Sequence, residues 1–172
     1  MDDPIVFLDI AIGARPIGRI EIALDVAAAP KTCENFRALC VGERASPSTR
    51  KPLHYASSVV HRVIPGFMIQ GGDLTNHNGT GGESIYGRTF RDENFTLKHD
   101  ARGVAASVMK NCDEFVFAPA FAMETTPHLD GKHCAFGRVL RGMDVVDAVE
   151  AVGSQSGATS VAVAVTDSGQ LS

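Results

Sequence analysis

The chain consists largely of short apolar segments separated by polar or turn residues, and this pattern most constrains the fold. Ile20, Ile22 and Leu24 alternate with less apolar residues. Valines occupy alternate positions from residue 161 to residue 165 in the same way. Strands with one buried face have this period of two, so the pattern predicts a fold dominated by β-strands.

Other segments complete the expected set of strands. Residues 4–12 are nearly all apolar, which predicts a well-buried strand followed by a turn over 15–18 and then the alternating strand. Residues 66–82 hold six glycines, too many for a regular element, so a closely packed loop is expected there. Further short strands are expected at 59–64, 103–109 and 133–140.

Only two segments have helical periodicity. Pro30 suits the first turn of a helix, and apolar residues then recur at helical spacing as far as residue 41. A second helix is expected from Gly142, where valines form one stripe. Many short strands with two well-separated helices favour a closed barrel capped by helices. The length of 172 residues fits one domain over 1–172.

Composition limits the classes of partner. A formal net charge of −4 gives no electrostatic reason to bind nucleic acid or an anionic membrane. No apolar run approaches the length of a membrane span, and the acidic start at 1–4 lacks the basic region of a secretory signal. We therefore expect a cytoplasmic protein.

The four cysteines form no CxxC pair. On one helix, Cys33 and Cys40 would lie about 10 Å apart along the axis, too far for a disulfide. Buried free thiols in a reducing compartment are the favoured interpretation, and a redox-responsive Cys40 is the alternative. His128 and His133 are interpreted as loop histidines, so we expect no metal and no cofactor.

Residues 60–73 carry the most informative chemistry. Arg62 lies among β-branched residues, Phe67 and Met68 follow a Pro-Gly turn, and Gln70 comes next. Arginine is rarely buried without a partner. The pattern leaves two readings open: Arg62 borders an apolar pocket, or it is solvated on an edge strand.

This segment resembles the signature of the cyclophilin family. The resemblance continues, in order, over 4–10, 16–19, 30–39, 78–82, 86–87, 90–95, 129–133, 136–137 and 169–171. It implies an all-β dominated fold, a closed eight-stranded antiparallel β-barrel capped by two α-helices. It also implies a peptidyl-prolyl cis-trans isomerase that assists protein folding. Proline-containing peptides or proteins are the implied partners, and a monomer is expected.

The resemblance also implies the role of each matching residue. Rotation about a peptide bond faces a barrier of about 18–20 kcal/mol because the C–N bond is conjugated. Arg62 matches the catalytic arginine, which donates to the prolyl nitrogen and favours the twisted transition state. The other matches are the apolar walls Phe67 and Met68, the backbone donor Gln70, and the pocket-lining Leu129 and His133.

Residues 103–126 depart from the family pattern. Met109 stands where an asparagine binds the substrate backbone, and Ala118 stands where a glutamine does. Ala120 replaces the phenylalanine at the floor of the proline pocket, although a slide of one residue would let Phe121 fill it. Loss of two hydrogen-bond partners predicts peptide binding weaker by about 1–3 kcal/mol.

Two functions therefore remain as hypotheses. The first is an active isomerase, slower than is typical of the family. The second is a pseudo-isomerase that serves as a proline-peptide or protein-interaction module. His128 occupies the position of a tryptophan that contacts cyclosporin, so we expect weak binding of that drug.

Residues 44–55 look like the longer loop of the divergent-loop cyclophilins. Cys40 and Glu83 also match that subgroup, but Ser168 stands where the subgroup often has a cysteine. A disulfide switch at Cys40 is therefore not expected. The basic pair at 50–51 is typical of a solvated loop, and docking of a partner there is left open.

Overall fold

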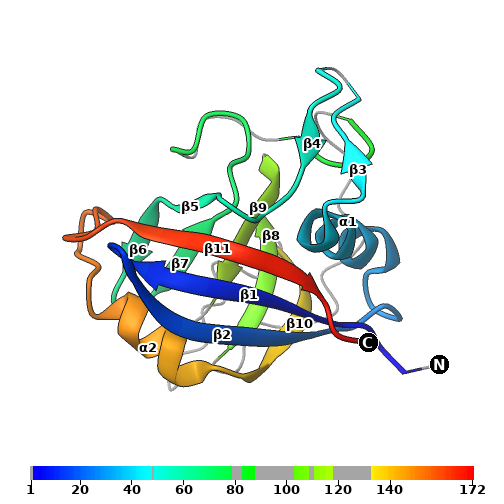
Figure 1. Cartoon of the computed structure of the whole chain (residues 1–172). Coiled ribbons are helices and arrows are strands. Elements are labelled where there is room, and N and C mark those ends of the chain that lie inside the picture. Colours follow the sequence, from blue (N-terminus) through cyan, green and yellow to red (C-terminus); the bar gives the residue numbers. More distant parts are fainter. Residues whose placement is uncertain (1, 48, 79–82, 88–102, 109–110, 118–132) are drawn as a thin grey trace.

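The computed structural model describes residues 2–47, 49–78, 83–87, 103–108, 111–117 and 133–172, with the backbone alone at 106–108, 111–117 and 133–134. The elements are β1 (Ile5–Ile12), β2 (Arg15–Leu24), α1 (Pro30–Val41), β3 (Arg44–Ala45), β4 (Pro52–Leu53), β5 (Val59–Val60), β6 (Arg62–Ile64), β7 (Met68–Gly71), β8 (Val104–Val108), β9 (Asn111–Phe117), β10 (His133–Arg141), α2 (Met143–Glu150) and β11 (Val163–Gln170). The main sheet has the order β5-β11-β1-β2-β10-β8-β9-β7-β6, and β3 pairs with β4 separately. Figure 1 shows a curled sheet with a helix toward each end.

The predicted N-terminal hairpin is confirmed, but its turn was misplaced. The chain reverses at residues 13–14, where Gly13 has a φ of +62°, and β2 already begins at Arg15. The Arg-Pro-Ile-Gly sequence at 15–18 predicted a turn because proline cannot donate to a sheet. The pairing of β1 with β2 shifts here, so that Ile17 has no paired partner and Pro16 is accommodated at a bulge.

The alternating residues of β2 and β11 form the core, as predicted, except that Val161 precedes β11 and is 43% exposed. Ile20, Ile22 and Leu24 of β2 are all at most 3% exposed. Val163 and Val165 of β11 are fully buried. Each such side chain contributes about 1.5–3 kcal/mol of burial free energy. The curled sheet therefore encloses the hydrophobic core.

Helix α1 has the predicted bounds and covers one end of this core. It ends at Gly42, whose φ of +77° is readily adopted only by glycine and whose N–H donates to the Ala38 carbonyl (2.8 Å). On its buried face, the Phe36 ring centroid lies 5.3 Å from that of Tyr55 and 4.7 Å from that of Phe136.

The last carbonyls of α1 bind groups from other elements. The Tyr55 N–H donates to the Leu39 carbonyl at 2.9 Å. The Cys40 carbonyl accepts two hydrogen bonds, from His54 Nε2 (2.9 Å) and from the buried Ser168 hydroxyl (2.7 Å). A helix leaves its final carbonyls without partners, and here other chain segments supply them. The end of α1 is thereby fixed to β11.

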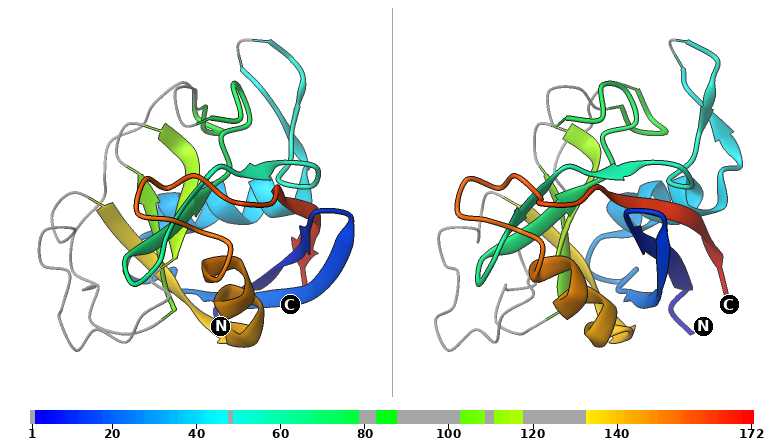
Figure 2. Two further views of the ribbon diagram at one scale, coloured as in Figure 1. Left: turned by 90° about the vertical axis from the view of Figure 1, so that its left-hand side faces the viewer. Right: turned by 60° about the vertical axis from the view of Figure 1, so that its left-hand side comes forward.

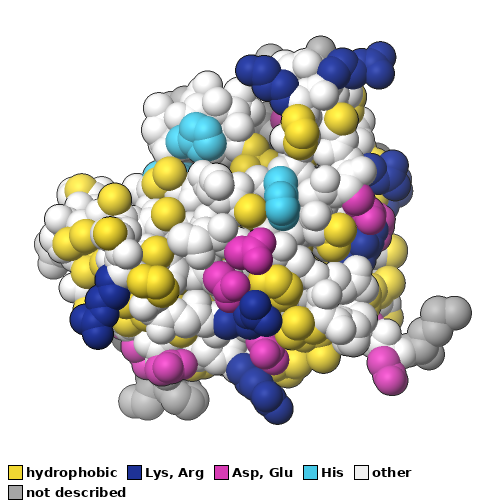
Figure 3. All heavy atoms as spheres, in the orientation of Figure 1, with side chains coloured by type: hydrophobic (Ala, Val, Ile, Leu, Met, Phe, Trp, Pro, Cys, Tyr) yellow, Lys and Arg dark blue, Asp and Glu magenta, His cyan; other side chains and the backbone are white. Residues whose placement is uncertain are grey.

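The stretch at 44–55, expected to be a long loop, contains the β3–β4 hairpin. Ser46, directly after β3, closes the loop that joins the two strands: it is 1% exposed, and its N–H donates to the Lys51 carbonyl at 2.7 Å. The Ser46 hydroxyl donates to the Glu83 carboxylate at 2.6 Å. The sequence indicated a loop here because strands of two residues are too short to show an alternating pattern. The hairpin projects from the body of the molecule, with basic side chains at its tip (Figures 1 and 3).

Two strands of the main sheet escaped prediction. Strand β7 lies in the glycine-rich stretch, where Gly66 and Gly72 fall outside the strand and Gly71 is its last residue. Strand β9 lies in the segment where the family pattern fails. The predicted strand at 59–64 is interrupted only at His61, so that β5 pairs with β11 and β6 pairs with β7.

Helix α2 begins after Gly142, near the predicted start. A Cβ atom on Gly142 would lie 2.2 Å from the Arg19 carbonyl oxygen, and φ is +94°, so only glycine fits. The buried valines of the predicted stripe are Val145, Val146 and Val149. None of the helices in the described part of the chain has the length and apolar character needed to cross a membrane.

Candidate active site

The β6–β7 hairpin brings four of the predicted site residues together. Arg62 is directly opposite Gln70 in this antiparallel pair, and Ile64 is opposite Met68. Opposed residues share a face of the sheet, and so do residues two apart on one strand. Arg62, Met68 and Gln70 therefore lie on one face, while the fully buried Val63 lies on the core face.

A tight turn joins the two strands and carries Phe67. The Phe67 N–H donates to the Ile64 carbonyl at 3.0 Å. Pro65 and Gly66 occupy the centre of the turn, and the φ of +75° at Gly66 is the left-handed conformation that a type II turn requires. Phe67 is half-buried and Met68 is 4% exposed. The turn thus places an aromatic ring next to the strand that begins with Met68.

Arg62 is exposed, and its aliphatic stem lies against the backbone of Gly157. A Cβ atom placed on Gly157 would be 2.7 Å from Arg62 Cγ and 3.3 Å from Nε. Within the described ranges, no acceptor forms a hydrogen bond with the Arg62 guanidinium. The sequence left open whether Arg62 borders a pocket or is solvated. In the structure, the Arg62 side chain is exposed while its aliphatic stem packs against Gly157.

Three residues that sequence analysis missed support this hairpin. The Val63 N–H donates to the Gly157 carbonyl (2.9 Å), and the Ser154 N–H donates to the Val63 carbonyl (3.1 Å). The Glu150 carboxylate accepts the Gly66 N–H at 2.9 Å. The sequence offered a weak signal, a glycine- and serine-rich stretch directly after the second helix. Each of these contacts is made to a backbone group of the hairpin, and such contacts leave no recognisable motif in the sequence.

Three more strands extend the same face of the sheet. Gln70 is opposite Val116 on β9, Val116 is opposite Ala106 on β8, and Ala106 is opposite Ala135 on β10. His133 lies two residues before Ala135, at the start of β10. The predicted pocket-lining residue His133 therefore occupies a register position on the same face of the sheet as Gln70, three strands away.

A comparison with protein families identifies the chain. The family model described as "Cyclophilin type peptidyl-prolyl cis-trans isomerase/CLD" matches residues 7–169. The chain belongs to the cyclophilin family. This confirms the predicted family and the predicted class of enzyme, a peptidyl-prolyl cis-trans isomerase that acts on proline-containing peptides or proteins.

The rest of the predicted pocket of this cyclophilin falls outside the described residues. These positions are Met109, Ala118, Ala120, Phe121, His128 and Leu129. His133 is described by its backbone alone. The floor of the proline pocket and the cyclosporin contact stay predictions.

The groups near Arg62 leave it the main cation of the site. Burial lowers the pKa of His61, Asp73 acts in the opposite direction, and the positive charge of Arg62 lowers it further. His61 is therefore neutral at neutral pH. The buried Asp73 carboxylate accepts backbone N–H groups of the following loop, from Thr75 (3.0 Å), Asn76 (2.9 Å) and Asn78 (3.3 Å). Within the described ranges, no cluster of ligand side chains could hold a metal ion.

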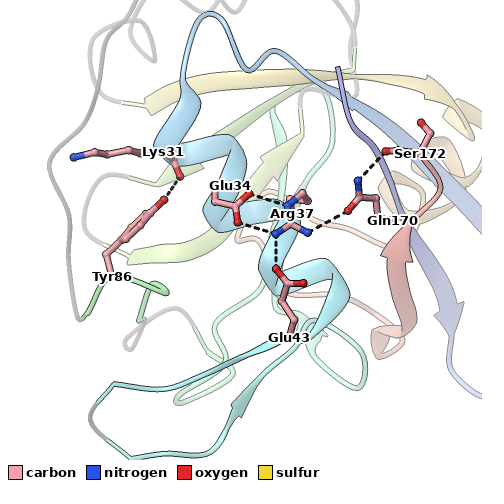
Figure 4. Close-up of polar contacts among 7 residues, drawn as sticks. All are labelled: Lys31, Glu34, Arg37, Glu43, Tyr86, Gln170 and Ser172. Carbon is pink, nitrogen blue, oxygen red and sulfur yellow. Dashed lines mark hydrogen bonds and ion pairs between the residues drawn. The ribbon is translucent and has the colours of Figure 1, made fainter. Parts of the chain in front are cut away.

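A second polar cluster of the cyclophilin has a structural role (Figure 4). The Arg37 guanidinium donates to both Glu34 carboxylate oxygens at 2.7 Å, and it also pairs with Glu43. A further bond of 3.1 Å reaches Gln170 Oε1 on β11. The hydrogen bonds to Glu34 and Glu43 raise the pKa of Arg37, and the bonds from Arg37 lower the pKa of Glu34. The cluster ties α1 to the base of the β3–β4 hairpin and to β11.

The outer face of β11, β1 and β2 carries charges of both signs. Figure 3 shows acidic and basic side chains intermingled over these strands. Arg19 pairs with Asp9 at 2.7 Å, and its guanidinium lies 3.8 Å from the centroid of the Phe7 ring. Opposite charges compensate one another here, so this face does not present the single-sign field that would attract a nucleic acid.

Proposed function

We propose that this cyclophilin isomerises X–Pro bonds through a hydrogen bond from Arg62 to the prolyl nitrogen. One observation carries the proposal: Arg62 is exposed and directly opposite Gln70, on the face that also holds Met68. A cation and a buried amide side by side, next to an apolar surface, suit a peptide that presents both a backbone and a proline ring.

The chemistry needs no nucleophile. In the planar ground state, the nitrogen lone pair is conjugated with the carbonyl, so it is a poor acceptor. Rotation breaks this conjugation, and the nitrogen becomes pyramidal and able to accept. A donor held at this position therefore stabilises the twisted transition state more than either ground state. Uncatalysed exchange takes tens of seconds or longer, which gives catalysis ample room.

Substrate binding follows from the neighbouring side chains. Phe67 and Met68 would flank the proline ring, and Gln70 would donate to the peptide backbone. The replacements at Met109 and Ala118 remove two expected partners, at about 0.5–1.5 kcal/mol each. We therefore propose an isomerase that is slower than is typical of its family, monomeric, and weakly bound by cyclosporin because of His128.

We also propose that the main sheet closes into an eight-stranded barrel. The two ends of the strand order, β5 and β6, are separated by a single residue. The Gly72 N–H, directly after β7, donates to the Val59 carbonyl of β5 at 3.4 Å. This bond supports a continuous strand over 59–64 with β11 on one side and β7 on the other.

Exchange NMR on an X–Pro peptide tests the proposed catalysis. Arg62→Ala should lower the enzyme-catalysed rate by about 10²-fold, which is typical for loss of one transition-state donor. Arg141→Ala is the matched control, because Arg141 has a side chain that is 81% exposed and sits at the far end of β10. The control should exchange the peptide at the wild-type rate.

The same measurement separates the two hypotheses. A wild-type protein that binds the peptide but leaves its exchange at the uncatalysed rate would be an interaction module. Equal catalysed rates in wild type and Arg62→Ala would refute the assignment of Arg62.

A further inference from the structure

The chain that follows α2 lies along the edge of β6 that β7 does not occupy. The N–H and the carbonyl of Val63 point away from β7. The N–H donates to the Gly157 carbonyl, and the carbonyl accepts the Ser154 N–H. Gly153 lies so close that an added Cβ atom would be 2.5 Å from Val63 Cγ1. Figure 2 shows this segment running beside β6.

The segment is internally braced. The Gly157 N–H donates to the Ser154 carbonyl at 3.0 Å, which closes a turn. The Ser154 hydroxyl lies 3.0 Å from the Ser156 hydroxyl and donates to the Ala158 carbonyl at 2.7 Å. The backbone that contacts β6 is therefore held in one conformation by its own hydrogen bonds.

Gly157 forms the surface on which the Arg62 stem rests. Its φ of +88° disfavours every other residue type, and a Cβ atom would overlap Arg62 Cγ. The stem therefore lies directly on backbone, with no side chain between. A methyl group here would push the stem, and with it the guanidinium, away from its present position.

Glu150 holds the other end of the hairpin. Its carboxylate accepts the N–H of Gly66, the residue immediately before Phe67. The same short stretch of chain thus contacts the strand that carries Arg62 and the turn that carries Phe67. Both contacts reach the hairpin from outside the main sheet.

We propose that residues 150–157 are a positioning element for the isomerase site. Gly157 fixes the direction of the Arg62 guanidinium, and Glu150 fixes the turn that bears Phe67. The inference rests on the proposed function of Arg62. A donor that must reach a pyramidal nitrogen is sensitive to its placement, since a shift of about 1 Å can cost about 10²-fold in rate.

Gly157→Ala tests the first contact. Its matched control is Gly87→Ala, because Gly87 also has a positive φ (+130°) but has nothing within 4 Å of an added Cβ atom. We expect Gly157→Ala to lower kcat by about tenfold and to leave the peptide Kd from NMR titration within about twofold, because the donor acts in the transition state. The Nε–Hε resonance of Arg62 should shift in Gly157→Ala and stay in place in the control.

Glu150 variants test the second contact and also serve if Gly157→Ala does not fold. Glu150→Ala removes the acceptor for the Gly66 N–H, whereas Glu150→Gln keeps an acceptor oxygen and loses only the charge. We expect the alanine variant to weaken peptide binding several-fold, and the glutamine variant to bind as the wild type does. Equal binding by the two variants would overturn the assignment of Glu150.

The outcomes for the two proposals are distinct. If Arg62→Ala retains full activity, the proposed function of Arg62 fails, whatever the other variants do. If Arg62→Ala is inactive while Gly157→Ala matches Gly87→Ala in kcat and in the Arg62 resonance, the catalytic proposal stands and the positioning role of Gly157 is refuted.

Discussion

The Cys40 carbonyl at the end of α1 accepts two hydrogen bonds, and this arrangement predicts a specific pattern of stability losses. Ser168→Ala removes the 2.7 Å bond, and His54→Phe removes the 2.9 Å bond while it keeps a ring in place. The ring matters because His54 packs over Gly42, where a Cβ atom would be 2.6 Å from its Cγ. Each single variant leaves the carbonyl with one partner.

The expected magnitudes follow from this shared acceptor. One lost hydrogen bond should cost about 0.5–1.5 kcal/mol in the free energy of unfolding. The double variant leaves a buried carbonyl without either donor, which adds a desolvation penalty of about 1–3 kcal/mol. The double loss should therefore exceed the sum of the single losses by about 1 kcal/mol or more.

Urea unfolding followed by far-UV circular dichroism suits this protein, because it contains no tryptophan. Ser160→Ala is the matched control: its hydroxyl also donates to a carbonyl, that of Val152, but at 3.4 Å and in an exposed position. The control should change the free energy by less than about 0.5 kcal/mol. Single losses that sum to the double loss within about 0.3 kcal/mol would refute the reasoning.

Three further predictions concern other parts of the molecule. Glu34 has a lowered pKa because of its hydrogen bonds to Arg37, so it stabilises the fold above its ordinary pKa of 4.5 and loses this effect as the pH falls. Glu34→Gln should thus be less stable than wild type by about 0.5 kcal/mol at pH 6, and urea titrations should give equal stabilities near pH 3. Burial raises the pKa of the Cys40 thiol, so iodoacetamide should label it at least about 10²-fold more slowly in the native protein than in urea, as peptide mass mapping would measure. Ser46→Ala should speed amide exchange in the β3–β4 hairpin about fivefold, the equivalent of about 1 kcal/mol for its bond to Glu83, and unchanged exchange would argue against that anchor.

Local signals predicted the two helices and strands β1, β2 and β11 well. Helix α1 begins at Pro30, whose ring fixes φ, and ends before Gly42, which readily adopts a positive φ, and both signals can be read in the sequence. The turn at 15–18 was wrong because a bulge absorbs Pro16, and a bulge depends on the partner strand. Strand β9 was missed because its segment combines charged and apolar residues without a period of two.

The candidate site was predictable where side chains carry the chemistry. Arg62, Phe67, Met68 and Gln70 were found from one segment, and the pairing of β6 with β7 brings that segment together. Glu150 and Gly157 were not found, because they act through backbone groups of distant residues. No one-dimensional pattern reports that a glycine lies beneath an arginine stem.

In the β3–β4 hairpin, the Ser46 N–H donates to the Lys51 carbonyl, so the ends of the connecting loop are joined, and the Ser46 hydroxyl fixes this junction to Glu83. Lengthening a loop whose ends are already joined is thermodynamically mild, at about 0.6 kcal/mol for each doubling. Figure 1 places this hairpin away from β6 and β7. The molecule therefore has a built-in grafting point, where a foreign recognition sequence could be displayed while the isomerase face keeps its geometry.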